Sequence, residues 1–196
     1  MIELSTPPLA TAADRVDERL LRARTVLLTG AIDHDLAAGV VGRLLALAAE
    51  GDEPIDLIVS SPGGHVESGD SIHDTIRFIR PRVRVIGTGW VASAAAFVFI
   101  AAPREDRFCL PNTRFLLHQP SGGVQGPASD MEIGAREILR MRDRVNRAFA
   151  RATGQTLEVI ERDTRRDFWM TADQAVQYGL VGRIVEAADQ LDAAGT

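Results

Sequence analysis

The side chains best suited to chemistry in this chain of 196 residues are a serine, a histidine and one of two aspartates. Ser93 interrupts a small and apolar stretch, residues 89–102, directly after residues 83–89, which read as a buried strand ending in glycine. A serine at such a strand-to-helix junction lies beside unpaired N–H groups and the positive end of the helix dipole. These groups stabilise the oxyanion that forms when a serine attacks a carbonyl. The pattern predicts a nucleophile at Ser93, and its alternative is a serine that packs or caps the helix.

His118 is the predicted general base for Ser93. It ends a predicted strand and stands directly before Gln119-Pro120, and a strand end holds a side chain rigidly. Among the other histidines, His34 and His73 are interpreted as surface or capping residues. His65 adjoins a glycine turn and is expected to line a site without doing chemistry.

A histidine base also needs a carboxylate that fixes its tautomer. Asp163 and Asp167 both lie in the segment that follows a long predicted helix. The residue pattern by itself does not choose between them.

The elements that must position these groups alternate in the first half of the chain. Predicted strands at residues 25–29, 55–60 and 83–87 alternate with helices at 14–24, from a cap at Asp33 onward, and at 66–79. Residues 89–102 are expected to form a buried core helix. This order predicts βαβ units and a largely parallel sheet. The turn Ser61-Pro62-Gly63-Gly64 falls at the carboxyl end of a strand, where sites gather in open α/β sheets.

The second half predicts two short strands at 107–110 and 114–118, then a glycine-rich segment at 119–126. A long helix is expected from an N-cap at Ser129 to about residue 151, ended by Gly154, with an apolar face formed by Met131, Ala135, Ile138, Val145 and Phe149. Such a helix either packs on the sheet or reaches into a partner subunit. Short helices at 156–163 and 171–178 and a strand at 181–185 complete the prediction.

Composition indicates one soluble globular domain of the α/β class. The hydrophobic content is 45%, the charged content 25%, the formal net charge −5 and the isoelectric point about 5.4, which favours neither nucleic acid nor an anionic membrane. Cys109 is the single cysteine, so no internal disulfide forms and a reducing, cytoplasmic location is expected. The N-terminus lacks the pattern of a signal peptide, and no cluster of metal ligands is apparent.

Taken together, these motifs resemble the proteolytic subunit of the Clp protease (ClpP), a serine peptidase of the crotonase-like fold. The matching segments occur in the family's order from about Arg22 to Val185: Ser61-Pro62-Gly63-Gly64, Ala92-Ser93, Leu110-Pro111-Asn112, His118-Gln119-Pro120, Gly122-Gly123, Gly126, Glu137-Ile138-Leu139, Thr153-Gly154-Gln155, Asp163-Thr164, Arg166-Asp167 and Tyr178-Gly179-Leu180.

The resemblance implies a single-domain ββα superhelix with a handle helix. Residues 1–12 would form an irregular arm, 13–187 the proteolytic domain and 188–196 a polar tail. It implies Ser93 as nucleophile, His118 as base and Asp167 as the orienting carboxylate, with Asp163 structural. The backbone N–H groups of Gly64 and Ala94 would form the oxyanion hole. Substrate-binding residues would be Gly63, His65, Val66, Ser121, Gly122 and Gly123.

The resemblance further implies heptameric rings stacked in pairs around a closed chamber, a tetradecamer that cleaves unfolded polypeptides and short peptides. A separate hexameric AAA+ unfoldase would hydrolyse ATP, and this chain would need no cofactor or metal. A paralogous peptidase subunit is a further expected partner. Two alternatives remain: a latent or structural ring subunit that needs such a paralogue, and an acyl-CoA enzyme of the crotonase type.

Four positions depart from the family's usual pattern. Ala94-Ala95 follows the serine in place of Met-Gly, and Arg165 stands where an acidic residue is frequent. Asp56 replaces an aromatic residue of the pocket where the ATPase docks. Since an unpaired carboxylate is costly to bury, Asp56 predicts weak coupling to a typical unfoldase. Carried over by position, the rest of that pocket comprises Ile58, Ile86, Thr88, Phe108 and Val185.

Overall fold

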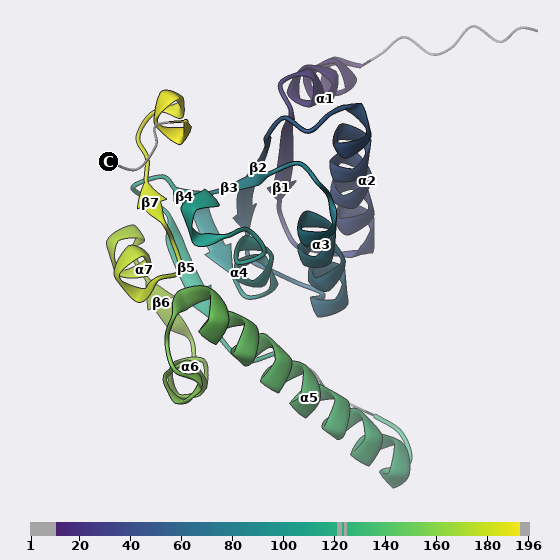
Figure 1. Cartoon of the computed structure of the whole chain (residues 1–196). Helices are drawn as coiled ribbons and strands as arrows, with labels where there is room; N and C mark the ends of the chain where they lie inside the picture. Colours follow the sequence, from purple (N-terminus) through teal and green to yellow (C-terminus); the bar gives the residue numbers. More distant parts are fainter. Residues whose placement is uncertain (1–10, 121–122, 124, 193–196) are drawn as a thin grey trace, which may run out of the picture.

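The computed structural model describes residues 11–120, 123 and 125–192. Within this part, seven strands form one sheet in the order β1-β2-β3-β4-β7, with β5 paired to β3 and β6 paired to β5 (Figure 1). All pairs are parallel except β5 with β6. The predicted βαβ organisation with a largely parallel sheet is therefore confirmed.

The elements have the following bounds. The strands are β1 (Thr25–Thr29), β2 (Ile55–Ser61), β3 (Val83–Ala92), β4 (Arg107–Cys109), β5 (Arg114–Leu117), β6 (Phe168–Met170) and β7 (Arg183–Ile184). The helices are α1 (Ala12–Arg22), α2 (His34–Glu50), α3 (Val66–Phe78), α4 (Ala94–Phe99), α5 (Ala128–Thr153), α6 (Leu157–Asp163) and α7 (Ala172–Tyr178), with short 3-10 helices η1 (Arg104–Asp106) and η2 (Ala188–Leu191).

Strand β3 is where the sheet divides. One edge of β3 pairs with β2. Along the other edge, the first half of β3 pairs with β4 through Val85 and Ile86, and the second half pairs with β5 through Trp90 and Val91. Gly87 is the last residue of β3 that pairs with β4, opposite Cys109, and it is packed closely, since an added Cβ would lie 3.1 Å from a methyl group of Val91. Because β5 branches off here, the carboxyl end of β3 meets the carboxyl end of β5 rather than that of β4.

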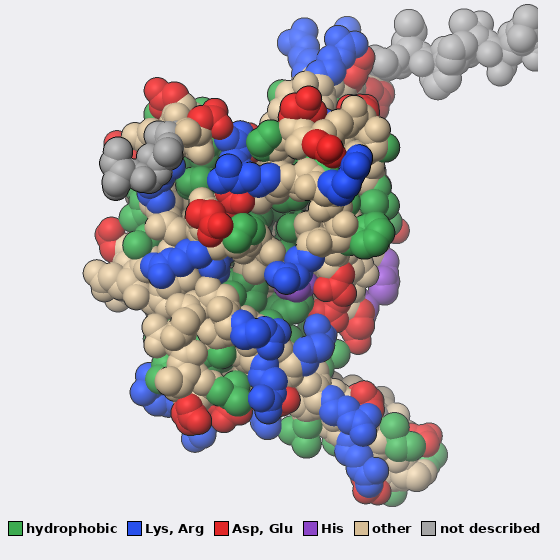
Figure 2. Space-filling view, in the orientation of Figure 1, with side chains coloured by type: hydrophobic (Ala, Val, Ile, Leu, Met, Phe, Trp, Pro, Cys, Tyr) green, Lys and Arg blue, Asp and Glu red, His purple; other side chains and the backbone are tan. Residues whose placement is uncertain are grey.

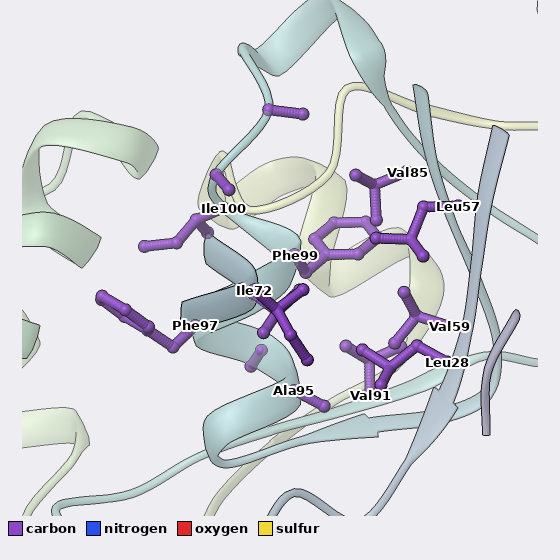
Figure 3. Close-up of a cluster of buried hydrophobic side chains, with 14 of the residues drawn as sticks. Leu28, Leu57, Val59, Ile72, Val85, Val91, Ala95, Phe97, Phe99 and Ile100 are labelled. Carbon is purple, nitrogen blue, oxygen red and sulfur yellow. The ribbon is translucent and has the colours of Figure 1, made fainter. Parts of the chain in front are cut away.

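Helix α4 lies at the centre of the core. All six of its residues are buried. Figure 3 shows Phe99, Ala95 and Phe97 of this helix facing different neighbours, among them Leu57, Val85 and Val91 of the sheet and Ile72 of α3. A helix that is apolar all round is stable only inside a protein.

Helix α5 extends away from the rest of the chain (Figure 1). Only the C-terminal part of its apolar face is buried, at Val145 and Phe149. Toward the other end Met131 of that face is 43% exposed, and Ile133 and Leu139, which lie outside it, are 59% and 51% exposed. Figure 2 shows hydrophobic side chains among charged ones on this projecting end. The apolar face predicted from the sequence is therefore packed in one half and bare in the other.

Several predicted boundaries are wrong. Strand β3 runs five residues past Gly87, so α4 starts only at Ala94 and the apolar stretch is part strand and part helix. The cap of α5 is Pro127 rather than Ser129. Gly154 ends the helix as predicted, and the structure places it in a left-handed conformation. Strand β6 was not predicted. Helix α1 begins and ends two residues earlier than expected, and β7 is shorter. The predicted division into arm, domain and tail stays a prediction.

Candidate active site

Ser93 stands on a strained corner between β3 and α4. Its φ of 56° and ψ of −122° lie in a region that residues with a Cβ rarely adopt. The corner is held from both sides, because the Ser93 amide donates to Leu116 O at 2.9 Å and its carbonyl accepts from Phe97 N at 3.1 Å. Although Ser93 occupies the N-cap position, its hydroxyl makes no capping hydrogen bond. The interpretation of Ser93 as a helix cap is therefore wrong, and the hydroxyl is available for another partner.

That partner is His118. Its Nε2 lies 2.8 Å from Ser93 Oγ. The sheet explains the proximity, because β3 and β5 are parallel neighbours with Ala92 opposite Leu116. Strand β3 ends at Ala92 and strand β5 ends at Leu117, so Ser93 and His118 directly follow the ends of two adjacent strands. The half-buried imidazole thus sits in hydrogen-bonding geometry with the serine in a single chain.

Asp167 lies on the other side of the imidazole, with Oδ1 3.1 Å from His118 Nδ1. Strand β6 causes this contact, since it runs antiparallel to β5 with Phe168 opposite Leu117. Asp167, the residue just before β6, therefore lies opposite His118, the residue just after β5. The Asp167 side chain is 64% exposed.

Asp163 is occupied elsewhere. Its carboxylate accepts a hydrogen bond from the Tyr178 hydroxyl at 3.0 Å and one from Arg162 Nε at 2.8 Å. Burial, together with the Asp163 carboxylate, raises the pKa of Tyr178 above its ordinary value. The two aspartates that the residue pattern could not separate thus differ in their contacts: Asp167 contacts His118, and Asp163 ties α6 to α7.

The turn at Gly63 and Gly64 is in contact with the serine corner. A Cβ on Gly63 would lie 2.7 Å from Ser93 Cβ and 2.9 Å from Ala94 N. A Cβ on Gly64 would lie 2.2 Å from the carbonyl oxygen of Ile32. Ile32 fixes the turn by donating to Gly63 O at 2.9 Å and accepting from His65 N at 2.8 Å. Only glycine fits at either position.

The amides of Gly64 and Ala94 are the two predicted oxyanion donors. Neither donates a hydrogen bond within the described part of the chain. Ala94 is the first residue of α4, where an amide has no partner inside its own helix. Both amides are thus free to receive an oxygen atom.

Comparison with known proteins identifies the family. The profile of the family described as Clp protease matches residues 10–188. The chain belongs to the Clp protease family. It is 59% identical over 169 residues to the ATP-dependent Clp protease proteolytic subunit 3 of Rhizobium etli, covering 86% of this chain and 87% of that one. It is 56% identical over 178 residues to subunit 2 of Pseudomonas aeruginosa, covering 91% and 89%.

A solved structure agrees with this assignment. A mutant of ClpP1 from Listeria monocytogenes superimposes with a TM-score of 0.84 at 48% identity, covering 90% of this chain and 99% of that one. The predicted fold of the Clp proteolytic subunit is therefore confirmed, as is the prediction of a serine peptidase of the Clp type. No helix in the described residues is long and apolar enough to cross a membrane.

A small apolar pocket of about 30 Å³ adjoins the serine in this Clp protease chain. Its lining comprises Val66, Ser93, Ala94, Phe97, Leu117, His118, Pro120, Val145 and Phe149. Val66 is a predicted substrate-binding residue, whereas the aromatic floor and the contribution of α5 were not predicted. Phe97 and Phe149 meet edge to face with ring centres 6.3 Å apart. Their spacing in the sequence gave no sign that they share a pocket with Ser93.

The remaining predicted binding residues have different positions. His65 is the N-cap of α3: its Nδ1 accepts from Ser68 N at 3.3 Å and lies 2.9 Å from Ser68 Oγ. It is not among the residues that line the pocket. Gly123 is exposed, and Ser121 and Gly122 lie outside the described residues. Among the described residues, no group of three or more His, Cys, Asp or Glu side chains is arranged to hold a metal ion.

The other two histidines, His73 and His34, each stack on another ring. His73 is not a surface residue, because its ring stacks on Phe97 with centres 4.4 Å apart. Burial lowers its pKa, against the opposing effect of the hydrogen-bonded Asp74. His34 stacks obliquely on His65, also at 4.4 Å.

An apolar cluster forms where the family's ATPase-docking pocket was expected. Ile86, Phe108 and Val185 are buried together, with Ile58 packed against them and Leu191 of η2 as an unpredicted member. Asp56, however, is not unpaired. Both its oxygens accept hydrogen bonds from Arg84, at 2.6 and 2.9 Å, and Arg84 also pairs with Asp192. The premise that Asp56 would bring an uncompensated charge is therefore wrong.

Proposed function

We propose that this chain is a serine endopeptidase that cleaves peptide bonds with Ser93, His118 and Asp167. The observation that carries the proposal is the continuous contact from Asp167 Oδ1 through the imidazole to Ser93 Oγ, at 3.1 and 2.8 Å. Nucleophile, base and orienting group lie in hydrogen-bonding range of one another, which is the arrangement that activates a serine at neutral pH.

The reaction follows from these positions. His118 Nε2 takes the proton of Ser93 as Oγ attacks the substrate carbonyl, and Asp167 holds the proton on Nδ1 and stabilises the imidazolium. The amides of Gly64 and Ala94 receive the oxyanion. His118 then gives its proton to the leaving amine, and an acyl-enzyme remains on Ser93. A water molecule, deprotonated by His118, releases the second product. All the groups named belong to this chain, and we propose no cofactor for the step.

The substrate chain lies extended beside the glycine turn. Gly63, Gly64, His65 and Val66 offer a backbone edge, to which a peptide adds as a further strand. The resemblance assigns the opposite side of the substrate to Ser121, Gly122 and Gly123, of which the structure describes Gly123. The apolar pocket below Ser93 receives the substrate side chain next to the scissile bond. Since that pocket is small, we expect a preference for modest apolar side chains such as Ala, Val or Leu.

Assembly into two stacked heptameric rings is the second part of the proposal. It is supported by the projecting half of α5, which exposes the large apolar side chains Met131, Ile133 and Leu139 around the helix. Patches of this kind mark protein interfaces. The rings enclose the active sites in a chamber, and a separate hexameric AAA+ unfoldase hydrolyses ATP and delivers unfolded polypeptides. Buried Cys109, whose pKa burial raises to about 12, suits a cytoplasmic location but takes no part in the reaction.

The decisive experiment measures hydrolysis of fluorogenic peptides by the assembled protein. Ser93→Ala is expected to lower kcat by a factor on the order of 10⁶, the loss typical of a triad nucleophile. A fluorophosphonate probe should label the unmodified chain at Ser93 and leave Ser93→Ala unlabelled. An acyl-CoA enzyme of the crotonase type would show neither peptide hydrolysis nor labelling, and a latent subunit would gain both on addition of a paralogue.

The two aspartates provide a matched control. Asp167→Asn should reduce kcat about 10⁴-fold, because the asparagine favours the wrong histidine tautomer. Asp163→Asn should retain activity in its folded fraction, with the loss confined to thermal stability. Inactive Asp163→Asn alongside active Asp167→Asn contradicts the assignment.

A further inference from the structure

A second cavity, of about 430 Å³, lies away from the proposed catalytic residues. Its walls come from α3, the segment after α4, β4 and the C-terminal turns of α5, and its lining includes Arg77, Arg104, Arg107 and Arg151. It shares no lining residue with the pocket at Ser93. Figure 2 shows arginine side chains gathered where α5 meets α3 and α4.

The cavity carries four guanidinium groups and no carboxylate among its lining residues. None of the four forms an ion pair within the described residues, although Arg80, Arg144 and Arg147 on the same helices or just beyond them each have an acidic partner. Arg77 and Arg104 reach only backbone carbonyls, those of Ala101 at 3.5 Å and Val176 at 3.2 Å. For Arg151 no hydrogen bond is formed within the described part of the chain. Positive charge is therefore concentrated here without internal compensation.

Arg107 makes the imbalance sharper, because it is only 2% exposed. Its Nη2 donates to Ala152 O at 2.7 Å, while its buried Nε and Nη1 have no partner in the described structure. Burial and the nearby Arg104 lower its pKa to about 10, which still leaves the group charged at neutral pH. Glu105 is the neighbouring carboxylate that opposes this shift, but it does not line the cavity. A buried cation with open donors is costly unless an anion compensates it.

We propose that this cavity binds a small phosphate-type oxyanion of about the size of pyrophosphate. Arginine matches the planar edges of phosphate oxygens with paired N–H donors, so exposed Arg77, Arg104 and Arg151 would bind the anion directly. Arg107 lies beneath them and adds its charge from the buried side. The cavity is large enough for two phosphate groups and open to solvent on one side. The proposal does not depend on the peptidase activity proposed above, since the two sites share no residue.

Isothermal titration of the full chain with sodium pyrophosphate, sodium phosphate and sodium succinate tests the proposal, each at constant ionic strength. We expect saturable binding of pyrophosphate, weaker binding of phosphate and no heat from the dicarboxylate. Arg104→Gln and Arg151→Gln should each weaken pyrophosphate binding at least tenfold. Arg107→Met should abolish it, and the two exposed positions keep the test valid if that buried variant does not fold.

Arg147→Gln is the matched control, because Arg147 lies on α5 one turn before Arg151, pairs with Asp143 and is outside the cavity. It should bind pyrophosphate within about twofold of the unmodified chain. Ser93→Ala should bind equally well, which separates this site from the proposed catalytic one. Equal losses in Arg147→Gln and Arg151→Gln, binding as tight with succinate as with pyrophosphate, or no saturable binding by the assembled protein would each overturn the proposal.

Discussion

The strained conformation of Ser93 leads to a stability prediction that separates strain from chemistry. At φ 56° and ψ −122°, a side chain is disfavoured and glycine is not. Ser93→Ala keeps the Cβ and its strain, whereas Ser93→Gly removes both. Both variants lose the hydroxyl and its contact with His118 Nε2, so both should be inactive. Any difference in stability between them then reports on the backbone at this corner.

The magnitude follows from two opposing effects. Relief of a disfavoured conformation is worth about 1–3 kcal/mol. Glycine gives back roughly 0.5–1 kcal/mol because the unfolded chain becomes more flexible. Ser93→Gly should therefore be more stable than Ser93→Ala by up to about 2.5 kcal/mol, with about 1 kcal/mol as the central value, which raises Tm by roughly 2–4 °C in a domain of this size.

Thermal unfolding followed by circular dichroism, at one protein concentration and scan rate, measures the difference. Size-exclusion chromatography before each scan shows that both variants have the same assembly state. A glycine variant as stable as the alanine variant, or less stable, would mean that the corner stores no strain. The geometry at Ser93 would then be an ordinary turn.

Three further predictions concern neighbouring features. Gly63→Ala should reduce kcat/KM about 10²-fold, because its Cβ would lie within 3 Å of the Ser93 corner and displace the nucleophile; a variant with normal peptide turnover contradicts this. Arg84→Ala should destabilise the fold by about 1–3 kcal/mol by leaving the Asp56 carboxylate half-buried and unpaired, and adding Asp56→Asn should recover part of that loss in urea unfolding. His73 has a lowered pKa in the folded state, so the unfolded chain takes up the proton first and stability should fall as pH drops below its ordinary value of 6.5. His73→Gln should flatten this dependence in Tm measurements between pH 7.5 and 5, and an unchanged slope would assign it to other groups.

The first half of the fold could be predicted because local patterns and tertiary packing agree there. Strand β1 has the predicted bounds, and Asp33 caps α2 by accepting from Leu36 N at 2.8 Å. The stretch 89–102 could not be divided correctly by pattern. Small and apolar residues suit a buried strand as well as a buried helix, and length alone favoured the helix. Pairing of Trp90 and Val91 with β5 decides where the strand ends, and this pairing is a long-range contact.

The two candidate carboxylates show the same limit at the scale of one side chain. Asp163 and Asp167 are four residues apart in the same segment after the long helix. What separates them is β6, a strand of three residues that is too short to give a periodic signal. Its antiparallel register places Asp167 opposite His118, while the end of α6 directs Asp163 to Tyr178.

Charged residues within strands were the hardest feature to interpret from the sequence. Two of them decide whether the apolar cluster at Ile86 and the cavity at Arg107 contain an unbalanced charge. Asp56 and Arg84 are direct partners in the register of β2 and β3, so the two side chains lie on one face and neutralise each other. A single sequence shows that each is charged but not which residue faces it. Arg107 is the opposite case. It starts β4 and is only 2% exposed, because the end of α5 covers it and supplies one carbonyl but no carboxylate. The charge of Arg84, which is largely buried, is balanced by the Asp56 carboxylate, whereas the charge of buried Arg107 has no carboxylate partner in the described structure. The unbalanced charge is therefore a feature of the cavity at Arg107 and not of every shielded arginine in this fold. That contrast is the physical ground for expecting an anion there.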